Sequence, residues 1–195
     1  MIDFLENIDG KLLLWINGMH NEWLDVFFWY ISKKYFLIPV YAVTLYFLIR
    51  VLKPKGAFWA LLFIALTVLF TDVISTQVFK EGVKRYRPSH NLVLGPKLHF
   101  HEEAPGVFYR GGQYGFFSSH AANFFGFVAF VFPLIYAKRK VWVWMLVFIG
   151  GLVCYSRMYL GVHYPSDVLA GILFGTASGI FFHWLFKRLK WVQTT

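Results

Sequence analysis

Five long apolar runs, separated by charged turns and one long polar loop, constrain what this chain can fold into. They cover residues 35–52, 56–79, 121–137, 141–155 and 168–186. The second run is long enough for a helix that crosses about 30 Å of hydrocarbon. Backbone N–H and C=O groups inside a bilayer must be satisfied within their own segment, so these runs predict helices. We therefore expect an all-α integral membrane helix bundle.

The composition and the length agree with one membrane-embedded domain. Hydrophobic residues make up 58% of the 195 positions and charged residues only 15%, which is too apolar for an ordinary soluble domain. A chain of this length usually forms one domain. We expect a single domain over residues 1–195, in which residues 56–187 form the core and residues 1–34 form an amphipathic N-terminal region.

The N-terminal region mixes apolar and charged residues, which predicts short helices. Leu12, Leu13 and Ile16 can share one helical face, whereas Asp9 interrupts any uniform apolar stretch. Asn21 is placed to cap a second short helix. We expect both helices to lie in the membrane interface or to pack on the bundle. The alternative is a first full span in this region, which would raise the number of transmembrane helices from five to six.

The basic residues lie at the ends of the apolar runs and predict the orientation of the chain. Those that share one end are Arg50, Lys53, Lys55, Lys138, Arg139, Lys140, Lys187, Arg188 and Lys190. Under the positive-inside rule this end is cytoplasmic. This clustering accounts for the net charge of +9, and no nucleic-acid partner is expected. We expect a multi-pass protein of the bacterial plasma (inner) membrane, surrounded by membrane lipids, whose other end faces the periplasm or the exterior.

Residues 156–167, between the last two apolar runs, bring a cation, an imidazole and a carboxylate to that other end. If a helix starts near Pro165, Asp167 lies about a turn beyond His163. A carboxylate there can accept a hydrogen bond from one ring nitrogen of His163 and leave the other nitrogen free to attack. Arg157 has the forked donors that suit a phosphate. The alternative is an Arg–Asp pair beside an interfacial histidine at a helix end.

Two earlier stretches complete a pattern that resembles the signature of the type 2 phosphatidic acid phosphatase superfamily. That signature reads KxxxxxxRP, then PSGH, then SRxxxxxHxxxD. The matching positions are Lys80, Arg87 and Pro88, then Ser118 and His120, then Ser156, Arg157, His163 and Asp167. The second motif is degenerate, because Phe117 and Ser119 stand where the family has proline and glycine. The resemblance covers roughly residues 56 to 187.

The resemblance implies a metal-independent phosphatase that needs no cofactor. His163 would attack phosphorus and form a phosphohistidine, and Asp167 would orient it. His120 would protonate the leaving oxygen and then activate the water that hydrolyses the intermediate. The residues that would hold the phosphate are Lys80, Arg87, Ser118, Ser119 (through its backbone N–H) and Arg157. The implied substrate is a lipid that carries a phosphomonoester or a diphosphate.

The resemblance leaves several substrates and two rival functions open. Superfamily members of this size act on undecaprenyl diphosphate, phosphatidylglycerophosphate or phosphorylated lipid A. We favour undecaprenyl diphosphate, because an outward-facing site matches the recycling of that carrier. The polar loop over residues 88–117 is long enough to be functional and is a candidate for choosing the headgroup. The rivals are a vanadate-dependent haloperoxidase and a non-enzymatic lipid transporter or scramblase with a dead phosphate site.

Two features lie outside the three motifs. His99 and His101, followed by Glu102, form a short pattern that can bind zinc, but no further ligand cluster is spaced around them. We expect them to be a solvated part of the loop. Asp72 is an ionisable residue inside an apolar run, which by default points to function. We expect its side chain to hydrogen-bond to a neighbouring helix in preference to a catalytic role.

Overall fold

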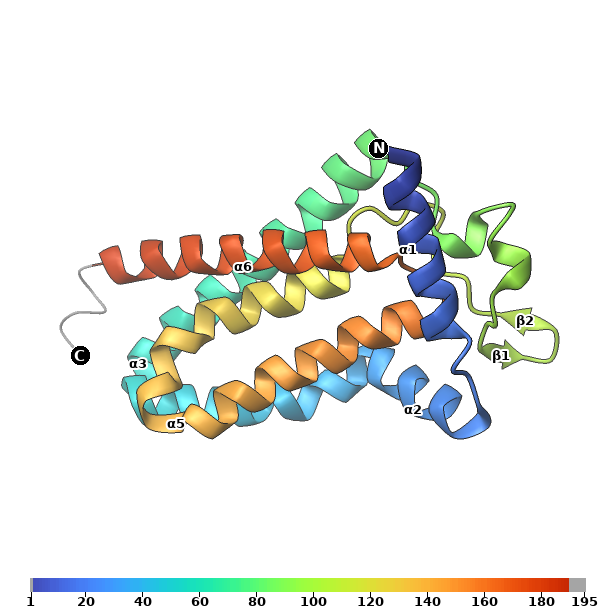
Figure 1. Cartoon of the computed structure of the whole chain (residues 1–195). Helices are drawn as coiled ribbons and strands as arrows, with labels where there is room; N and C mark the ends of the chain where they lie inside the picture. The colour runs from blue at the N-terminus through green and yellow to red at the C-terminus, as the bar shows by residue number, and fades with distance from the viewer. Residues whose placement is uncertain (1, 190–195) are drawn as a thin grey trace.

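The structure is a computed structural model that describes residues 2–189, and most of these residues are helical (Figure 1). The longer helices are α1 (Ile2–Asn17), α2 (Glu22–Ser32), α3 (Leu37–Val73), α5 (Ser119–Tyr159) and α6 (Pro165–Arg188). A π-helical stretch, η2 (Ile74–Lys80), and one further turn, α4 (Glu81–Val83), continue α3. Single 3-10 turns are η1 (Lys34–Phe36), η3 (Pro88–His90) and η4 (Gly95–Lys97). Lys190, one of the basic residues that predict the orientation, lies outside the described residues.

Three helical segments among residues 2–189 are long and apolar enough to cross a membrane: Leu37–Val83, Ser119–Tyr159 and Pro165–Arg188. Two of them contain a residue with non-helical backbone angles, Lys53 (φ 58°, ψ 169°) in α3 and Arg139 (φ −140°, ψ 45°) in α5. The chain reverses direction at both positions, so that α3 and α5 each form two rods (Figure 1). Both reversals coincide with the basic turns that separate apolar runs in the sequence.

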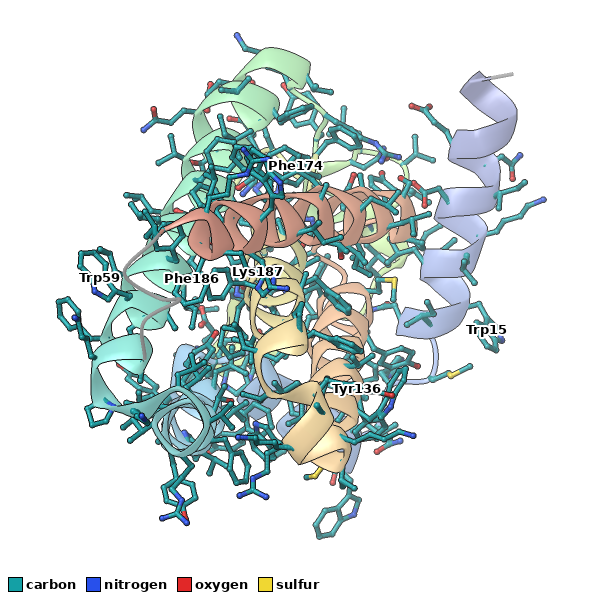
Figure 2. The ribbon with its side chains drawn as sticks, turned by 90° about the vertical axis from the view of Figure 1, so that its left-hand side faces the viewer. Trp15, Trp59, Tyr136, Phe174, Phe186 and Lys187 are labelled. Carbon is teal, nitrogen blue, oxygen red and sulfur yellow. The ribbon has the colours of Figure 1, made fainter. Side chains whose placement is uncertain are left out.

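The N-terminal region forms the two short helices that the sequence predicts. Asn21 caps α2, since its Oδ1 accepts a hydrogen bond from the backbone N–H of Leu24 at 3.0 Å. α1 lies across the right-hand end of the bundle in Figure 1 and contacts α5 and α6, while α2 packs against α5. The Trp15 side chain is 63% exposed and points away from the bundle (Figure 2). This placement agrees with helices that pack on the bundle and offer apolar side chains to the membrane interface.

α6 packs against the first half of α5 at unusually short range because glycines line the contact. A Cβ atom on Gly175 would lie 2.2 Å from the carbonyl oxygen of Ala122, and one on Gly179 would lie 2.3 Å from that of Gly126. Small residues four positions apart share one helical face and let two backbones approach. The same contact brings the two helix N-termini together.

The segment between α4 and α5 covers the right-hand end of the bundle in Figure 1. It contains the antiparallel pair β1 (Glu102–Ala104) and β2 (Val107–Phe108), which an all-α expectation did not include. Its backbone is tied down by specific hydrogen bonds: the Tyr109 N–H donates to the His101 carbonyl at 2.9 Å, and Ser89 Oγ donates to the Arg110 carbonyl at 2.6 Å. These bonds join separate parts of the loop and hold it in a folded form.

The glycine contact makes a testable prediction about stability. In Gly175→Ala the new methyl group cannot fit against the Ala122 carbonyl, so α6 must move away from α5. We expect the variant to lose about 1–3 kcal/mol of stability and to unfold at lower temperature in detergent. Gly151→Ala is the matched control, because nothing lies within 4 Å of the added Cβ there. Equal melting temperatures for the two variants would contradict this packing.

Candidate active site

A cavity of about 550 Å³ lies at the end of the bundle where the three motifs meet. Its lining residues are Leu37, Tyr41, Val68, Asp72, Lys80, Arg87, Ser119, His120, Asn123, Phe124, Val153 and His163. The set contains both histidines and two of the three cations that the sequence singles out. It also includes a group of apolar side chains, so the cavity has a charged side and an apolar side.

His163 is 1% exposed and both of its ring nitrogens face charged groups. Nε2 lies 3.0 Å from Arg87 Nη1, and Nδ1 lies 3.5 Å from Asp167 Oδ2. A guanidinium can only donate, so Nε2 must carry the lone pair and Nδ1 the proton. The proton faces the carboxylate, as the spacing of His163 and Asp167 predicts, although the contact lacks hydrogen-bond geometry. Nε2 then carries the free lone pair of the ring.

Burial, together with the charges around His163, favours its neutral form. Burial lowers its pKa well below the usual value, and the positive charges of Arg87 and Arg157 act in the same direction. The pKa of Arg87 falls to about 10, chiefly through burial and then through repulsion by Arg157. A neutral imidazole with a free lone pair is the form that can attack an electrophile.

Two cations, Lys80 and Arg87, line the cavity, and a third, Arg157, lies outside its lining. Lys80 Nζ donates to Ser119 Oγ at 2.6 Å, and Arg87 donates to the backbone carbonyls of Tyr114 and Val162. Arg157, which is 2% exposed, donates to the hydroxyl groups of Ser32 and Tyr109. Within residues 2–189 none of the three cations has a carboxylate oxygen within 4 Å. Desolvated cations without a counter-ion are costly, so the cluster is suited to an anion.

The N-terminus of α5 completes the polar side of the cavity. Ser118 is its N-cap residue, but the side chain makes no capping hydrogen bond. Its Oγ is buried and has no partner among the described residues. Ser119 and His120 form the first turn and line the cavity. Free backbone N–H groups at a helix N-terminus favour a bound anion.

Arg85 belongs to the site although it lies outside the three sequence motifs. Its Nη1 donates to Asp167 Oδ1 at 2.7 Å, and its Nη2 donates to Asp9 Oδ2 of α1 at 2.7 Å. Asp9 also accepts from the backbone N–H of Ser166 at 2.9 Å. Arg85 therefore fixes the carboxylate that faces His163. One signal existed: Arg85 and Arg87 are two positions apart in an extended segment, which places both side chains on one side.

The chain matches a known protein family. The model of the PAP2 superfamily matches residues 56–191.

The chain belongs to the PAP2 superfamily.

Two relatives match nearly the whole chain. A lipid A 4'-phosphatase of Bacteroides thetaiotaomicron is 35% identical and covers 97% of this chain and 81% of its own length. A lipid A 4'-phosphatase of Porphyromonas gingivalis is 31% identical, over 98% of this chain and 79% of its own. The crystal structure of a transmembrane PAP2 type phosphatidylglycerolphosphate phosphatase from Bacillus subtilis has a TM-score of 0.65, with 21% identity over 95% of this chain and 88% of that one. The chain is a PAP2-type membrane phosphatase.

The structure also bears on two alternatives from the sequence, an Arg157–Asp167 ion pair and a zinc site at His99 and His101. An Arg157–Asp167 pair does not form, since Asp167 pairs with Arg85. His99 lies 2.8 Å from Asp25 Oδ2, and the His101 ring stacks on Trp29 with 4.3 Å between centroids. No group of three His, Cys, Asp or Glu side chains in the described part of the chain could hold a metal ion.

The electrostatics of His163 predict the pH dependence of catalysis. The neutral form is lost as pH falls through the lowered pKa, so the acid limb set by His163 lies below the usual value of about 6.5. Arg87→Gln removes a positive charge that opposes protonation, which raises this pKa. We expect kcat to fall by about 10²–10³-fold and the acid limb of kcat/KM, which reports the free enzyme, to move to higher pH.

The substrate's own ionisation is the same for both proteins, so the difference between their profiles isolates the enzyme group. Lys84→Gln removes an exposed cation outside the cavity and should leave the limb in place. An Arg87→Gln profile that coincides with the wild-type profile, or that moves to lower pH, would show that Arg87 does not depress the pKa of His163.

Proposed function

We propose that the chain hydrolyses a phosphate monoester of lipid A, or of a phosphorylated glycolipid of the same kind, through a phosphohistidine at His163. The observation that carries the phosphatase chemistry is the set of three unpaired cations beside two histidines at the end of an apolar bundle. The choice of lipid A is supported by two relatives that match almost the full chain. The sequence analysis favours undecaprenyl diphosphate, but the match of this chain to an undecaprenyl-diphosphatase covers only 36 residues.

The first half of the reaction transfers phosphorus to the enzyme. His163 Nε2 forms a bond to phosphorus while the ester oxygen leaves and takes a proton from His120. In the absence of substrate Arg87 donates to Nε2. A phosphate oxygen is a stronger acceptor for this guanidinium, so substrate binding would draw Arg87 away and free the lone pair. Asp167, held by Arg85, would stabilise the positive charge that develops on His163.

The second half returns the enzyme to its starting state. Water attacks phosphorus, His120 takes its proton, and the N–P bond breaks to release inorganic phosphate. Lys80, Arg87 and Arg157 supply positive charge to the phosphoryl oxygens in both steps. The Ser119 backbone N–H and the unpartnered Ser118 Oγ are further donors at the start of α5.

The reversals at Lys53 and Arg139 support five transmembrane segments, two each from α3 and α5 and one from α6. The basic residues cluster at the reversal end, and the cavity lies at the other end. Under the positive-inside rule we assign the reversal end to the cytoplasm of a bacterial plasma (inner) membrane. The active site then opens to the periplasm or exterior, and α1 and α2 lie on that surface.

The proposal is tested by phosphate release from purified protein in detergent. The panel comprises lipid A, undecaprenyl diphosphate, phosphatidylglycerophosphate and phosphatidic acid, each with and without EDTA. We expect the highest kcat/KM with lipid A, no effect of EDTA, and a loss of about 10³-fold or more in His163→Ala. His20→Ala, which removes an exposed histidine outside the cavity, is the control.

Each contrary result has a distinct meaning. Faster release from another lipid would refute the assignment of lipid A and leave the chemistry intact. Undiminished release by His163→Ala would refute the mechanism. Lipid movement between leaflets without release from any lipid would favour a transporter with a dead site, and peroxidase activity on addition of vanadate would favour a haloperoxidase.

A further inference from the structure

Asp72 is a carboxylate in an apolar helix, and its side chain faces the active-site cavity. It belongs to the membrane-crossing part of α3 and is exposed, and its neighbours Leu69 and Phe70 are exposed apolar side chains. It lines the same cavity as His120 and His163. An ionisable side chain in a membrane-crossing helix is costly, so its presence points to a functional site. The mechanism above gives Asp72 no role.

Asp72 is held in place from α5. Asn123 Nδ2 donates to Asp72 Oδ1 at 3.0 Å, which supplies the neighbouring-helix partner that the sequence predicts. Asn123 Oδ1 in turn accepts from Thr71 Oγ1 at 2.7 Å, and Thr71 is fully buried. Both ends of the Asn123 amide are used, so its orientation is fixed. Asp72 Oδ2 has no hydrogen-bond partner among the described residues, which leaves one acceptor free on a residue that lines the cavity.

The Asp72 acceptor lies where it could contact the part of the substrate that leaves with the ester oxygen. Asn123 lies one turn after His120 on α5, so the two side chains are neighbours on the helix face that borders the cavity. His120 is the proposed proton donor to the leaving oxygen. The apolar side of the cavity, formed by Leu37, Tyr41 and Val68, offers room for acyl chains nearby. Headgroup atoms close to the scissile bond would therefore pass Asp72.

We propose that Asp72, positioned by Asn123, accepts a hydrogen bond from a hydroxyl or amide N–H of a sugar headgroup beside the scissile phosphate. The inference rests on the proposed function and deepens it, because it names what selects the substrate. Amino-sugar lipids carry such donors, whereas diacylglycerol and polyprenyl leaving groups carry none. A fixed negative charge at this place also repels the second phosphate of a diphosphate. Asp72 is thus a specificity residue that favours phosphorylated glycolipids.

The test compares Asp72→Asn with the wild type on lipid A and on phosphatidic acid, whose diacylglycerol has no donor. Because a lost hydrogen bond to a charged acceptor weakens binding by about 10- to 100-fold, we expect kcat/KM for lipid A to fall by that factor, mainly through KM. The value for phosphatidic acid should stay within about threefold of the wild type. Inhibition by orthovanadate, which has no headgroup, should not change.

Glu81→Gln is the matched control for charge. It removes a carboxylate next to Lys80 in the sequence, and Glu81 is exposed and does not line the cavity. It should behave as the wild type on both lipids. Melting temperatures of all three proteins in detergent show that they are folded alike.

The outcomes separate the two claims. An equal loss on both lipids, with weaker vanadate inhibition, would show that Asp72 acts through the charge of Lys80 and would overturn the inference. Unchanged kcat/KM for lipid A would overturn it as well, while the proposed function would stand. A wild type that leaves lipid A intact would refute the proposed function and the inference with it.

Discussion

Lys80, Arg87 and Arg157 gather at one end of an apolar bundle, and no carboxylate oxygen of the described residues lies within 4 Å of any of them. Each cation donates hydrogen bonds to neutral groups, which leave its charge uncompensated. The nearby carboxylate, Asp167, is occupied by Arg85. The protein therefore keeps its positive potential for a ligand, and a phosphate group supplies the missing charge.

The close contact between α5 and α6 determines where the charged side chains of the site lie relative to one another. Gly171, Gly175 and Gly179 let the two backbones touch, and the Ser118 N–H donates to the Asp167 carbonyl at 3.0 Å across the helix starts. The start of α5 carries His120, and the start of α6 carries Asp167. α1 adds a second restraint, because Asp9 holds both Arg85 and the backbone of Ser166. Side chains from distant parts of the chain are thus placed around one phosphate-sized space.

The parts of this structure that could be predicted are those determined by local chemistry. Apolar runs give helices in a membrane, and the basic turns around Lys53 and Arg139 mark where the chain reverses. The histidines and cations of the motifs stood out because phosphate chemistry needs those side chains. Asp9 did not stand out, because its partner Arg85 is 76 positions away and depends on how α1 crosses the bundle. The free Ser118 side chain and the β1–β2 pair also depend on packing that the sequence does not display.

The proposed mechanism requires that His163 becomes covalently phosphorylated, and trapping that species tests it. His120→Ala removes the proposed base for hydrolysis, so the intermediate should outlive turnover. The variant is incubated with lipid A that carries a radiolabelled phosphate, quenched at alkaline pH, digested and mapped by mass spectrometry. We expect label on the peptide that contains His163 and none in the His120→Ala, His163→Ala double variant. Phosphate release by the single variant with no label on His163, or label on another residue, would contradict it.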